Sequence, residues 1–178
     1  MIDSNPASFP NLPKGRLLCP ISAIENTRYQ REVVLDSEPA RYEILSLEDG
    51  DHAVTQEWEP VTHPEGSLYL YHRQKQIYTD AYLYHNETRQ EIELFADYIN
   101  TVLQSSRTSL PSVDYEIVLD LRPVDHETIY WFYYCVDHAS RSIFWPEPYV
   151  ADHLVDEVTG SKSFAHLKLM IEYNFWTH

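Results

Sequence analysis

Four Asp-His dipeptides are the first feature of this sequence that carries the side chains of a metal site. Adjacent residues of a strand point to opposite faces, so a single dipeptide is a poor bidentate ligand for one ion. The nine histidines could converge in space, but they include no His-x-x-x-His spacing. We therefore expect no metal ion. The four dipeptides are Asp51-His52, Asp125-His126, Asp137-His138 and Asp152-His153.

Cys135 and His138 are the nearest approach to a nucleophile and its base. A catalytic thiol needs the imidazole within hydrogen-bonding reach, whereas strand alternation places these two side chains on opposite faces. The sequence also lacks the Gly-x-Ser-x-Gly motif of serine hydrolases. We expect a protein that is not an enzyme and that holds no cofactor.

The aromatic residues around these positions form a more informative pattern. Residues 129–136 are dense in Tyr, Trp, Phe and Val, and a polar turn separates them from a second aromatic strand. Period-2 alternation places Tyr134, Val136 and His138 on one face of the first strand. Trp145 on the second strand can then lie beside Tyr134, which predicts an aromatic contact surface.

Similar patterns along the chain predict the elements that position this surface. Alternation and β-rich composition predict strands, and apolar side chains at helical spacing predict helices. Thr88 and Glu91 match a capping box at the start of the first helix. Its apolar face comprises Ile92, Phe95, Ala96, Ile99, Val102 and Leu103. The strands are expected at 32–35, 42–45, 67–71, 77–79, 115–121, 129–136 and 143–145, and the helices at about 88–103, 150–158 and 164–175.

The order of these elements predicts an internal repeat. When His72 is aligned with His138, Lys75 falls on Arg141 without a gap. Strands followed by helices therefore occur twice. The predicted division is a flexible, Pro-rich arm (1–20) and a single α+β domain (21–178) of two units (about 54–105 and 113–178).

Residues 134–148 resemble the second and third strands of a WW domain. The matching features are an aromatic residue, the Asp137-His138 pair, a Ser-Arg turn, Trp145 and Pro148. WW domains are three-stranded antiparallel sheets that bind proline-rich peptides. The resemblance implies an α+β fold of two tandem, degenerate WW-like three-stranded antiparallel sheets, or one merged sheet, each followed by helices on one side.

The same resemblance implies a peptide-binding site. Tyr134 and Trp145 would form a slot for one proline of a polyproline II helix, which loses little entropy on docking. Val136, His138 and Arg141 would form the neighbouring pocket, which in WW domains receives the tyrosine of a Pro-Pro-x-Tyr motif. We therefore expect a protein–protein interaction module whose partner is a proline-rich peptide or protein.

Both units depart from the WW pattern. The second unit lacks the first-strand tryptophan near Pro123, and Cys135 replaces an aromatic residue. The first unit has Trp58, but Thr79, or Asp80 in a register shifted by one residue, stands where the ligand-binding tryptophan belongs. We expect no proline binding by the first unit. The three tryptophans outside the predicted slot are expected in the core: Trp58, Trp131 and Trp176.

A wider resemblance covers residues 25–178. The pattern is similar to that of uncharacterised WW-containing proteins of mushroom-forming (basidiomycete) fungi, which tend to continue into hydrophobic, membrane-spanning segments. We expect a truncated chain, because it ends inside the last predicted helix. The alternative to a peptide-binding adaptor is a non-binding structural domain, the soluble head of a larger membrane-attached protein, with the slot filled by its own chain. The matching segments are 28–31, 63–69, 78–81, 137–145 and 166–178.

Composition excludes several other classes of partner. The 13 Lys and Arg residues against 28 Asp and Glu give a net charge of −15, which disfavours nucleic acids and anionic membranes. Four glycines leave no phosphate-binding loop. The chain has no Cys-x-x-Cys pair, secretion signal or membrane-spanning run, so we expect a cytoplasmic chain that does not itself contact a membrane. The acidic excess is either a solvated surface or an aid to meeting a basic, proline-rich partner, and the oligomeric state stays open.

Overall fold

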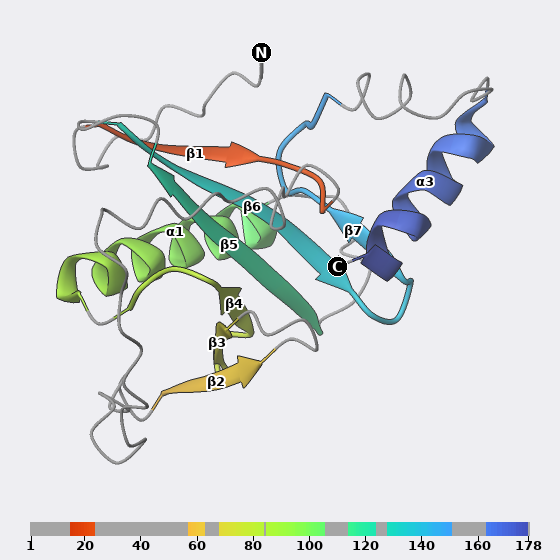
Figure 1. The fold of residues 1–178 in the computed structure, drawn as a ribbon. Helices are drawn as coiled ribbons and strands as arrows, with labels where there is room; N and C mark the ends of the chain where they lie inside the picture. The colour runs from red at the N-terminus through yellow and green to blue at the C-terminus, as the bar shows by residue number, and fades with distance from the viewer. Residues whose placement is uncertain are drawn as a thin grey trace, which may run out of the picture.

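The computed structural model of the chain describes residues 15–23, 57–62, 68–83, 85–105, 114–123, 128–150 and 163–177. Seven strands and two helices lie in these ranges (Figure 1). The strands are β1 (Arg16–Pro20), β2 (Trp58–Thr62), β3 (Leu68–His72), β4 (Ile77–Thr79), β5 (Tyr115–Pro123), β6 (Ile129–Asp137) and β7 (Ser142–Phe144), and the helices are α1 (Asn86–Ser105) and α3 (Phe164–Thr177).

All seven strands belong to one sheet. Its order is β1-β6-β5-β4-β3-β2, and β7 also pairs with β6. Strands β2, β3 and β4 are antiparallel neighbours, as are β5, β6 and β7. Strands β4 and β5 pair in parallel, which requires a crossover such as the one that α1 supplies. The fold is therefore α+β, with one merged sheet rather than two separate ones.

Strand β1 lies in the segment for which the sequence predicts a flexible arm. Its residues Arg16–Pro20 pair in parallel with Ile129–Tyr133 of β6, and Leu18 and Cys19 are buried. The flexible arm is therefore wrong for these five residues. The physical reason is that β7 covers only the last part of β6, so its first part needs another partner for its backbone groups.

The two hairpin turns correct the predicted internal alignment. His72 pairs with Ile77 across one turn, and Asp137 pairs with Ser142 across the other. The last residue of each turn has a positive φ, of 53° in the first and 54° in the second. His72 is therefore the structural equivalent of Asp137, and its predicted alignment with His138 is wrong by one residue.

Hydrogen bonding explains why a histidine and an aspartate occupy equivalent places. Nδ1 of His72 accepts a hydrogen bond from the backbone N–H of Lys75 at 3.3 Å. Oδ1 of Asp137 accepts one from the backbone N–H of Ala139 at 3.0 Å. Both side chains accept a hydrogen bond from a backbone amide of their own turn, His72 from the third residue after it and Asp137 from the second. The requirement is for an acceptor at this position, and either residue type meets it.

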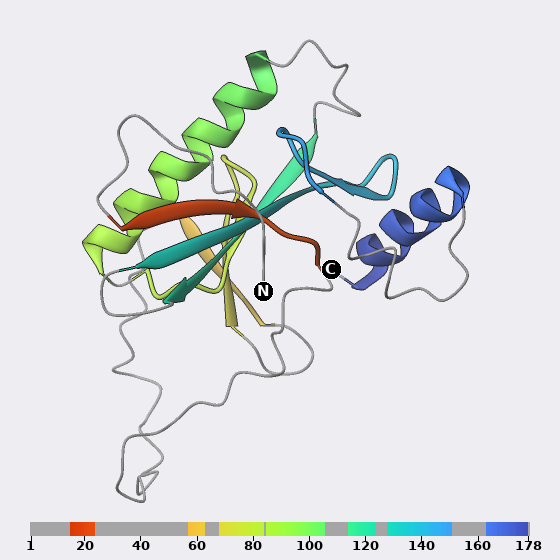
Figure 2. The ribbon, with the colours of Figure 1, turned by 90° about the horizontal axis from the view of Figure 1, so that it is seen from above.

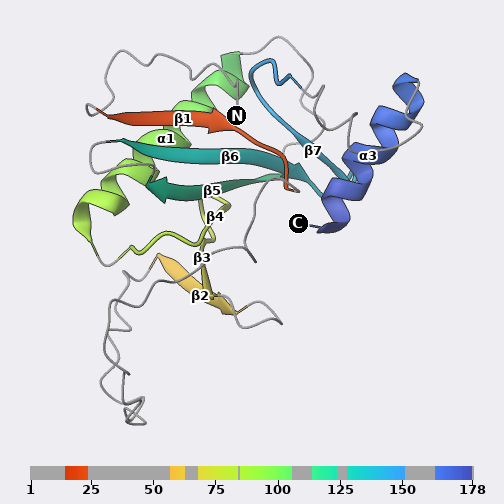
Figure 3. The same ribbon diagram turned by 45° about the horizontal axis from the view of Figure 1, so that its top comes forward.

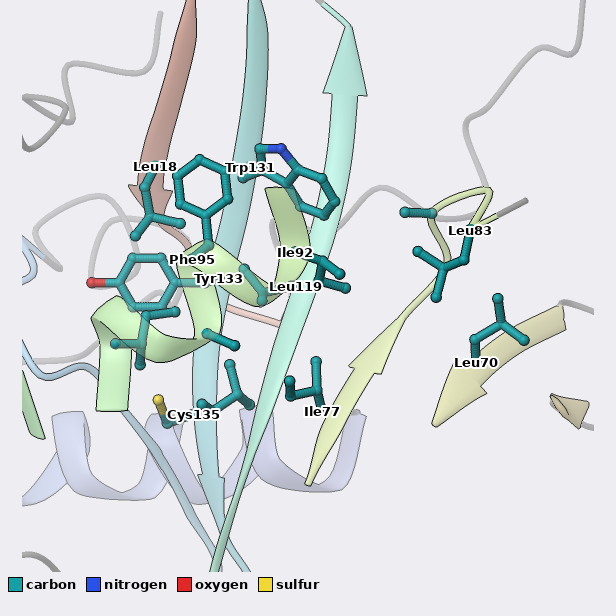
Figure 4. Close-up of a cluster of buried hydrophobic side chains, with 14 of the residues drawn as sticks. Leu18, Leu70, Ile77, Leu83, Ile92, Phe95, Leu119, Trp131, Tyr133 and Cys135 are labelled. Atoms are coloured by element: carbon teal, nitrogen blue, oxygen red, sulfur yellow. The ribbon is translucent and has the colours of Figure 1, made fainter. Parts of the chain in front are cut away.

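Helix α1 covers one face of the sheet, and it begins earlier than predicted. It starts at Asn86, so Thr88 lies inside the first turn instead of capping it. The carboxylate of Glu91 makes tertiary contacts, because it accepts hydrogen bonds from Arg16 Nε at 2.7 Å and from Trp131 Nε1 at 3.0 Å. The apolar face of the helix packs on the buried sheet residues that Figure 4 shows.

Helix α3 packs against the opposite face of the sheet (Figures 2 and 3). Its residues Ile171 and Phe175 pack against the cluster that contains Tyr134 and Val136, whereas α1 packs against the cluster that contains Cys135. Side chains alternate along β6, so these clusters lie on different faces. The expectation that the helices share one side is wrong, because β6 is apolar on both faces and each needs cover.

Several predicted elements lie outside the described residues. They are the strands at 32–35 and 42–45, the helix at 150–158 beyond Val150, and the dipeptides at 51–52, 125–126 and 152–153. Neither helix of the described ranges is long and apolar enough to cross a bilayer.

Candidate functional site

The five residues of the predicted peptide site come from one hairpin. Tyr134 and Val136 belong to the end of β6, His138 and Arg141 belong to the turn, and Trp145 follows β7. The structure brings all five to the end of the sheet that α3 covers. Their accessibility therefore depends on what α3 and neighbouring segments leave open.

Tyr134 and Val136 are the least accessible of the five. Both are 0% exposed, and both lie in the cluster that also contains Ile21 and Ala23 of the segment after β1. Two parts of the chain thus meet over the face that the sequence assigns to a ligand. In this conformation neither side chain has a ring or methyl group that a peptide can contact.

Trp145 is partly buried and has two contacts of its own. Its indole Nε1 donates a hydrogen bond to the backbone carbonyl oxygen of Ile21 at 2.7 Å. Its ring also stacks on that of Tyr149, with 4.1 Å between the centroids and 20° between the planes. The second wall of the predicted slot is therefore already stacked against an aromatic ring of the same chain.

His138 and Arg141 are exposed, and each contacts an aromatic residue of α3. The side chain of His138 is 55% exposed, and its Nε2 lies 2.7 Å from Oε2 of Glu116. The imidazole meets Phe175 edge to face, with 5.6 Å between the centroids. The guanidinium of Arg141 lies 5.6 Å from the centroid of Trp176. Helix α3 thus places two rings on the half of the site predicted to receive an aromatic side chain.

Sequence reasoning missed some of the residues that fill this face. Phe164, Leu167, Ile171 and Phe175 recur at helical spacing within the predicted helix at 164–175, so periodicity does indicate the inward face of α3. The role of Ile21 had no local signal, because it acts through its backbone carbonyl on Trp145, 124 residues away. The stacking of Tyr149 was equally invisible, since nothing in the spacing distinguishes it from other tyrosines.

The predicted separation of Cys135 and His138 is confirmed. Cys135 is fully buried in the cluster beneath α1, and this burial raises the pKa of its thiol well above its usual range. His138 lies at the other face, against α3. A thiol that stays protonated and faces away from the imidazole is not an activated nucleophile. Among the residues that the structure describes, no group of three or more His, Cys, Asp or Glu side chains is arranged to hold a metal ion.

The first hairpin has a different surface at the corresponding positions. In the corrected register Asp80 is the equivalent of Trp145, so this hairpin has no aromatic second wall. Tyr71 and Tyr78 stack on each other instead, with 4.3 Å between the centroids and 22° between the planes. Burial, assisted by the charge of Glu116, raises the pKa of Tyr78 to about 12.

Two of the three tryptophans expected in the core are there. Trp58 and Trp131 are buried, and Trp58 meets His72 edge to face at 5.0 Å. The prediction for Trp176 is wrong, because it is 64% exposed. Its helix is apolar on more than one side, and only one side can face the sheet.

Comparison with known proteins yields no match to a protein-family model, a curated protein or a solved structure.

Proposed function

We propose that this chain is a non-enzymatic, WW-like structural domain whose second-unit peptide face is filled by its own residues. The burial of Tyr134 and Val136, each 0% exposed, carries the proposal. Recognition of a polyproline II peptide needs an accessible, aromatic-lined groove. A proline-rich peptide has no accessible tyrosine ring to dock against while the chain keeps this conformation.

The contacts of Trp145 support the same proposal. A ligand carbonyl that needs the indole N–H would have to displace the carbonyl of Ile21, and a proline that needs the indole ring would have to displace Tyr149. The first exchange replaces one hydrogen bond by another, so it contributes little net free energy. The filled site therefore disfavours binding by the closed conformation.

A second candidate is a conditional adaptor that binds a Pro-Pro-x-Tyr type peptide after α3 has moved. Its support is the exposure of His138 and Arg141, each of which contacts α3 through a single aromatic ring, Phe175 and Trp176 respectively. Ring contacts of these kinds contribute roughly 0.5–1.5 kcal/mol each. Displacement of α3 from this end of the sheet must also break the apolar packing of Ile171 and Phe175 against the cluster that contains Tyr134, so the peptide has to supply the free energy of that packing as well.

Peptide titration of the full chain separates the two candidates. Pro-Pro-x-Tyr and Pro-Leu-Pro peptides are added to the wild type, to Phe175→Ala, which loosens α3, and to Trp145→Ala, which removes the slot. Backbone amide shifts report binding, and circular dichroism verifies that each variant is folded. The structural domain predicts no saturable shift for any of the three proteins up to about 1 mM peptide, a range that still detects weak complexes.

The other outcomes are equally informative. Saturable binding by Phe175→Ala alone supports the conditional adaptor. Saturable binding by the wild type that is lost in Trp145→Ala overturns the structural domain and establishes an adaptor that is always open.

A cytoplasmic location is part of the proposal. Both cysteines are free and buried, and chains with unpaired thiols are typical of reducing compartments. Alkylation of intact cells followed by mass measurement tests this, because recovery of either cysteine as a disulfide would contradict it.

A further inference from the structure

Residues 15–23 contact the rest of the fold along their whole length. They comprise β1 and its flanking residues, and β1 pairs in parallel with the first part of β6. Near one end of the segment, Arg16 pairs with Glu91 at 2.7 Å. Near the other end, the carbonyl oxygen of Ile21 accepts the hydrogen bond of the Trp145 indole, also at 2.7 Å. Four side chains of the segment are at most 2% exposed: Leu18, Cys19, Ile21 and Ser22.

The position of this segment resembles that of a bound peptide. In the order of the sheet β1 is the first strand, and among the described strands it pairs only with β6 (Figure 3). Pro20 near its end has no N–H to offer to a further strand. The residues that hold the segment lie at least 75 positions away in the sequence. Its removal therefore breaks no pairing among the other six strands.

The backbone contacts of the segment are ones that a separate chain can make. The N–H of Ile129 donates to the carbonyl oxygen of Gly15 at 2.9 Å, and the N–H of Ile21 donates to that of Tyr133 at 3.0 Å. An extended peptide that adds to a sheet edge gains its affinity from such main-chain hydrogen bonds, whatever its sequence. Residues 129–133 of β6 supply this edge.

The side chains of the segment supply the specificity. Leu18 packs in the cluster beneath α1, whereas Cys19 and Ile21 pack in the cluster that contains Tyr134 on the other face. A small side chain suits position 19, because Cys19 is 1% exposed. The carboxylate of Glu91 selects a guanidinium at position 16. These contacts define the pattern Arg-x-Leu-small-x-Ile.

We propose that the edge of β6 is a strand-addition site for an extended peptide of this pattern, and that residues 15–23 are its resident occupant. The inference rests on the proposed function, because it identifies a segment that fills the peptide face. It adds a partner class, since another chain that carries Arg-x-Leu-small-x-Ile can replace the resident segment. The added peptide runs parallel to β6, as β1 does.

Replacement of the resident segment is tested on the full chain with a labelled peptide of residues 15–23. Ile21→Asp places a carboxylate at a position that is 2% exposed, so it weakens the resident segment. This variant should bind the wild-type peptide with a Kd of about 10–500 μM, whereas the wild-type chain should show no saturation over that range. The matched control is a peptide that itself carries Ile21→Asp, which should not bind.

A second variant guards against loss of the fold. Arg16→Glu opposes Glu91 with a like charge, and it is the milder change because the side chain of Arg16 is 22% exposed. It should also bind the wild-type peptide, and circular dichroism verifies that each variant is folded. A variant that is unfolded alone but regains its spectrum when the peptide is added also supports the proposal.

The indole N–H resonances locate the peptide and give its direction. The Trp145 signal, assigned with Trp145→Phe, should shift in Ile21→Asp and return toward its wild-type position when the peptide binds. A spin label at the carboxyl end of the peptide should broaden this signal most. A label at the amino end should instead broaden the signal of Trp131, because Trp131 and Arg16 share the carboxylate of Glu91.

Four results would overturn the proposal. The first is a folded variant that does not bind the peptide of residues 15–23, and the second is a pair of unfolded variants that the peptide does not refold. The third is equal binding by the wild type and the variants, and the fourth is a Trp145 indole signal that saturation leaves unchanged. Saturable binding of a Pro-Pro-x-Tyr peptide by the wild type overturns the proposed function instead, so the two failures are distinguishable.

Discussion

Replacing Glu91 by alanine removes one carboxylate that joins three elements. Glu91 lies on α1 and accepts hydrogen bonds from Arg16 of β1 at 2.7 Å and from Trp131 of β6 at 3.0 Å. The alanine variant leaves the indole N–H of Trp131, a fully buried residue, without this acceptor. It also leaves the guanidinium of Arg16 without its ion pair.

The loss of the hydrogen bond and the loss of the ion pair together set the expected decrease in the free energy of unfolding. An unsatisfied buried donor costs about 1–3 kcal/mol. The ion pair is partly screened, since the side chains of Arg16 and Glu91 are 22% and 11% exposed, and it adds about 1 kcal/mol at most. The free energy of unfolding should therefore fall by about 1–4 kcal/mol, out of the roughly 5–15 kcal/mol that is typical of a domain. For a chain of this length the melting temperature falls by roughly 2–16 °C.

Urea denaturation of the full chain, monitored by tryptophan fluorescence, measures the change. Glu93→Ala is the matched control on the same helix, because Glu93 is 44% exposed and pairs only loosely with Lys75 at 3.5 Å. It should alter the free energy of unfolding by no more than about 0.5 kcal/mol.

A double-mutant cycle isolates the hydrogen bond to the indole. Trp131→Phe removes the donor, so Glu91→Ala should cost less in that background by about 1–2 kcal/mol. A Glu91→Ala variant as stable as the Glu93→Ala control would refute the reasoning, and so would a cycle with no coupling between residues 91 and 131.

The remaining predictions concern pH and two buried hydrogen bonds. Burial raises the pKa of the Cys19 thiol from 9.0 to about 11, so the unfolded state loses this proton first, and Cys19 should lower stability between pH 9 and 11 by up to about 1.4 kcal/mol per pH unit. Buried Cys135 acts in the same direction, so Cys19→Ala should reduce the slope by the contribution of one thiol without abolishing it; denaturation at several pH values checks this. Thr79→Val should lower stability by about 1–2 kcal/mol, because buried Oγ1 accepts a hydrogen bond from the Ala81 N–H at 3.1 Å; an unchanged melting temperature would contradict it. Trp145→Phe keeps a ring but loses the bond to Ile21, and urea titration should show a loss of about 1 kcal/mol.

Local patterns predicted most of the elements that the structure describes. Period-2 alternation identified the strands around 68–71, 77–79, 115–121 and 129–136, and helical spacing identified α1 and α3 within a few residues of their observed ends. These signals come from neighbouring residues, so they do not depend on the rest of the fold. Residue identity can still mislead, as the two hairpin turns illustrate. The predicted alignment matched His72 with His138 because both are histidines. The structurally equivalent residues are His72 and Asp137, which both supply a hydrogen-bond acceptor to the turn.

The assembly of these elements depended on contacts between distant residues. The sequence predicts a flexible arm at residues 16–20, because a segment of five residues with two prolines nearby shows no clear periodicity. These residues form a strand because they pair with the part of β6 that β7 leaves uncovered. The accessibility of the predicted site was decided in the same way, since Ile21, Tyr149 and α3 meet over residues 134–145 from three parts of the chain.

The sequence by itself determined the aromatic hairpin, the separation of Cys135 from His138 on opposite faces, and the acidic surface charge. These properties follow from residue type and from the two-residue period of a strand. Only the tertiary structure decided that both faces of β6 are covered, that the predicted slot is filled from within, and that Trp176 faces solvent. The physical reason is that burial depends on which surfaces the whole chain brings together, and an apolar residue's type does not specify its neighbour.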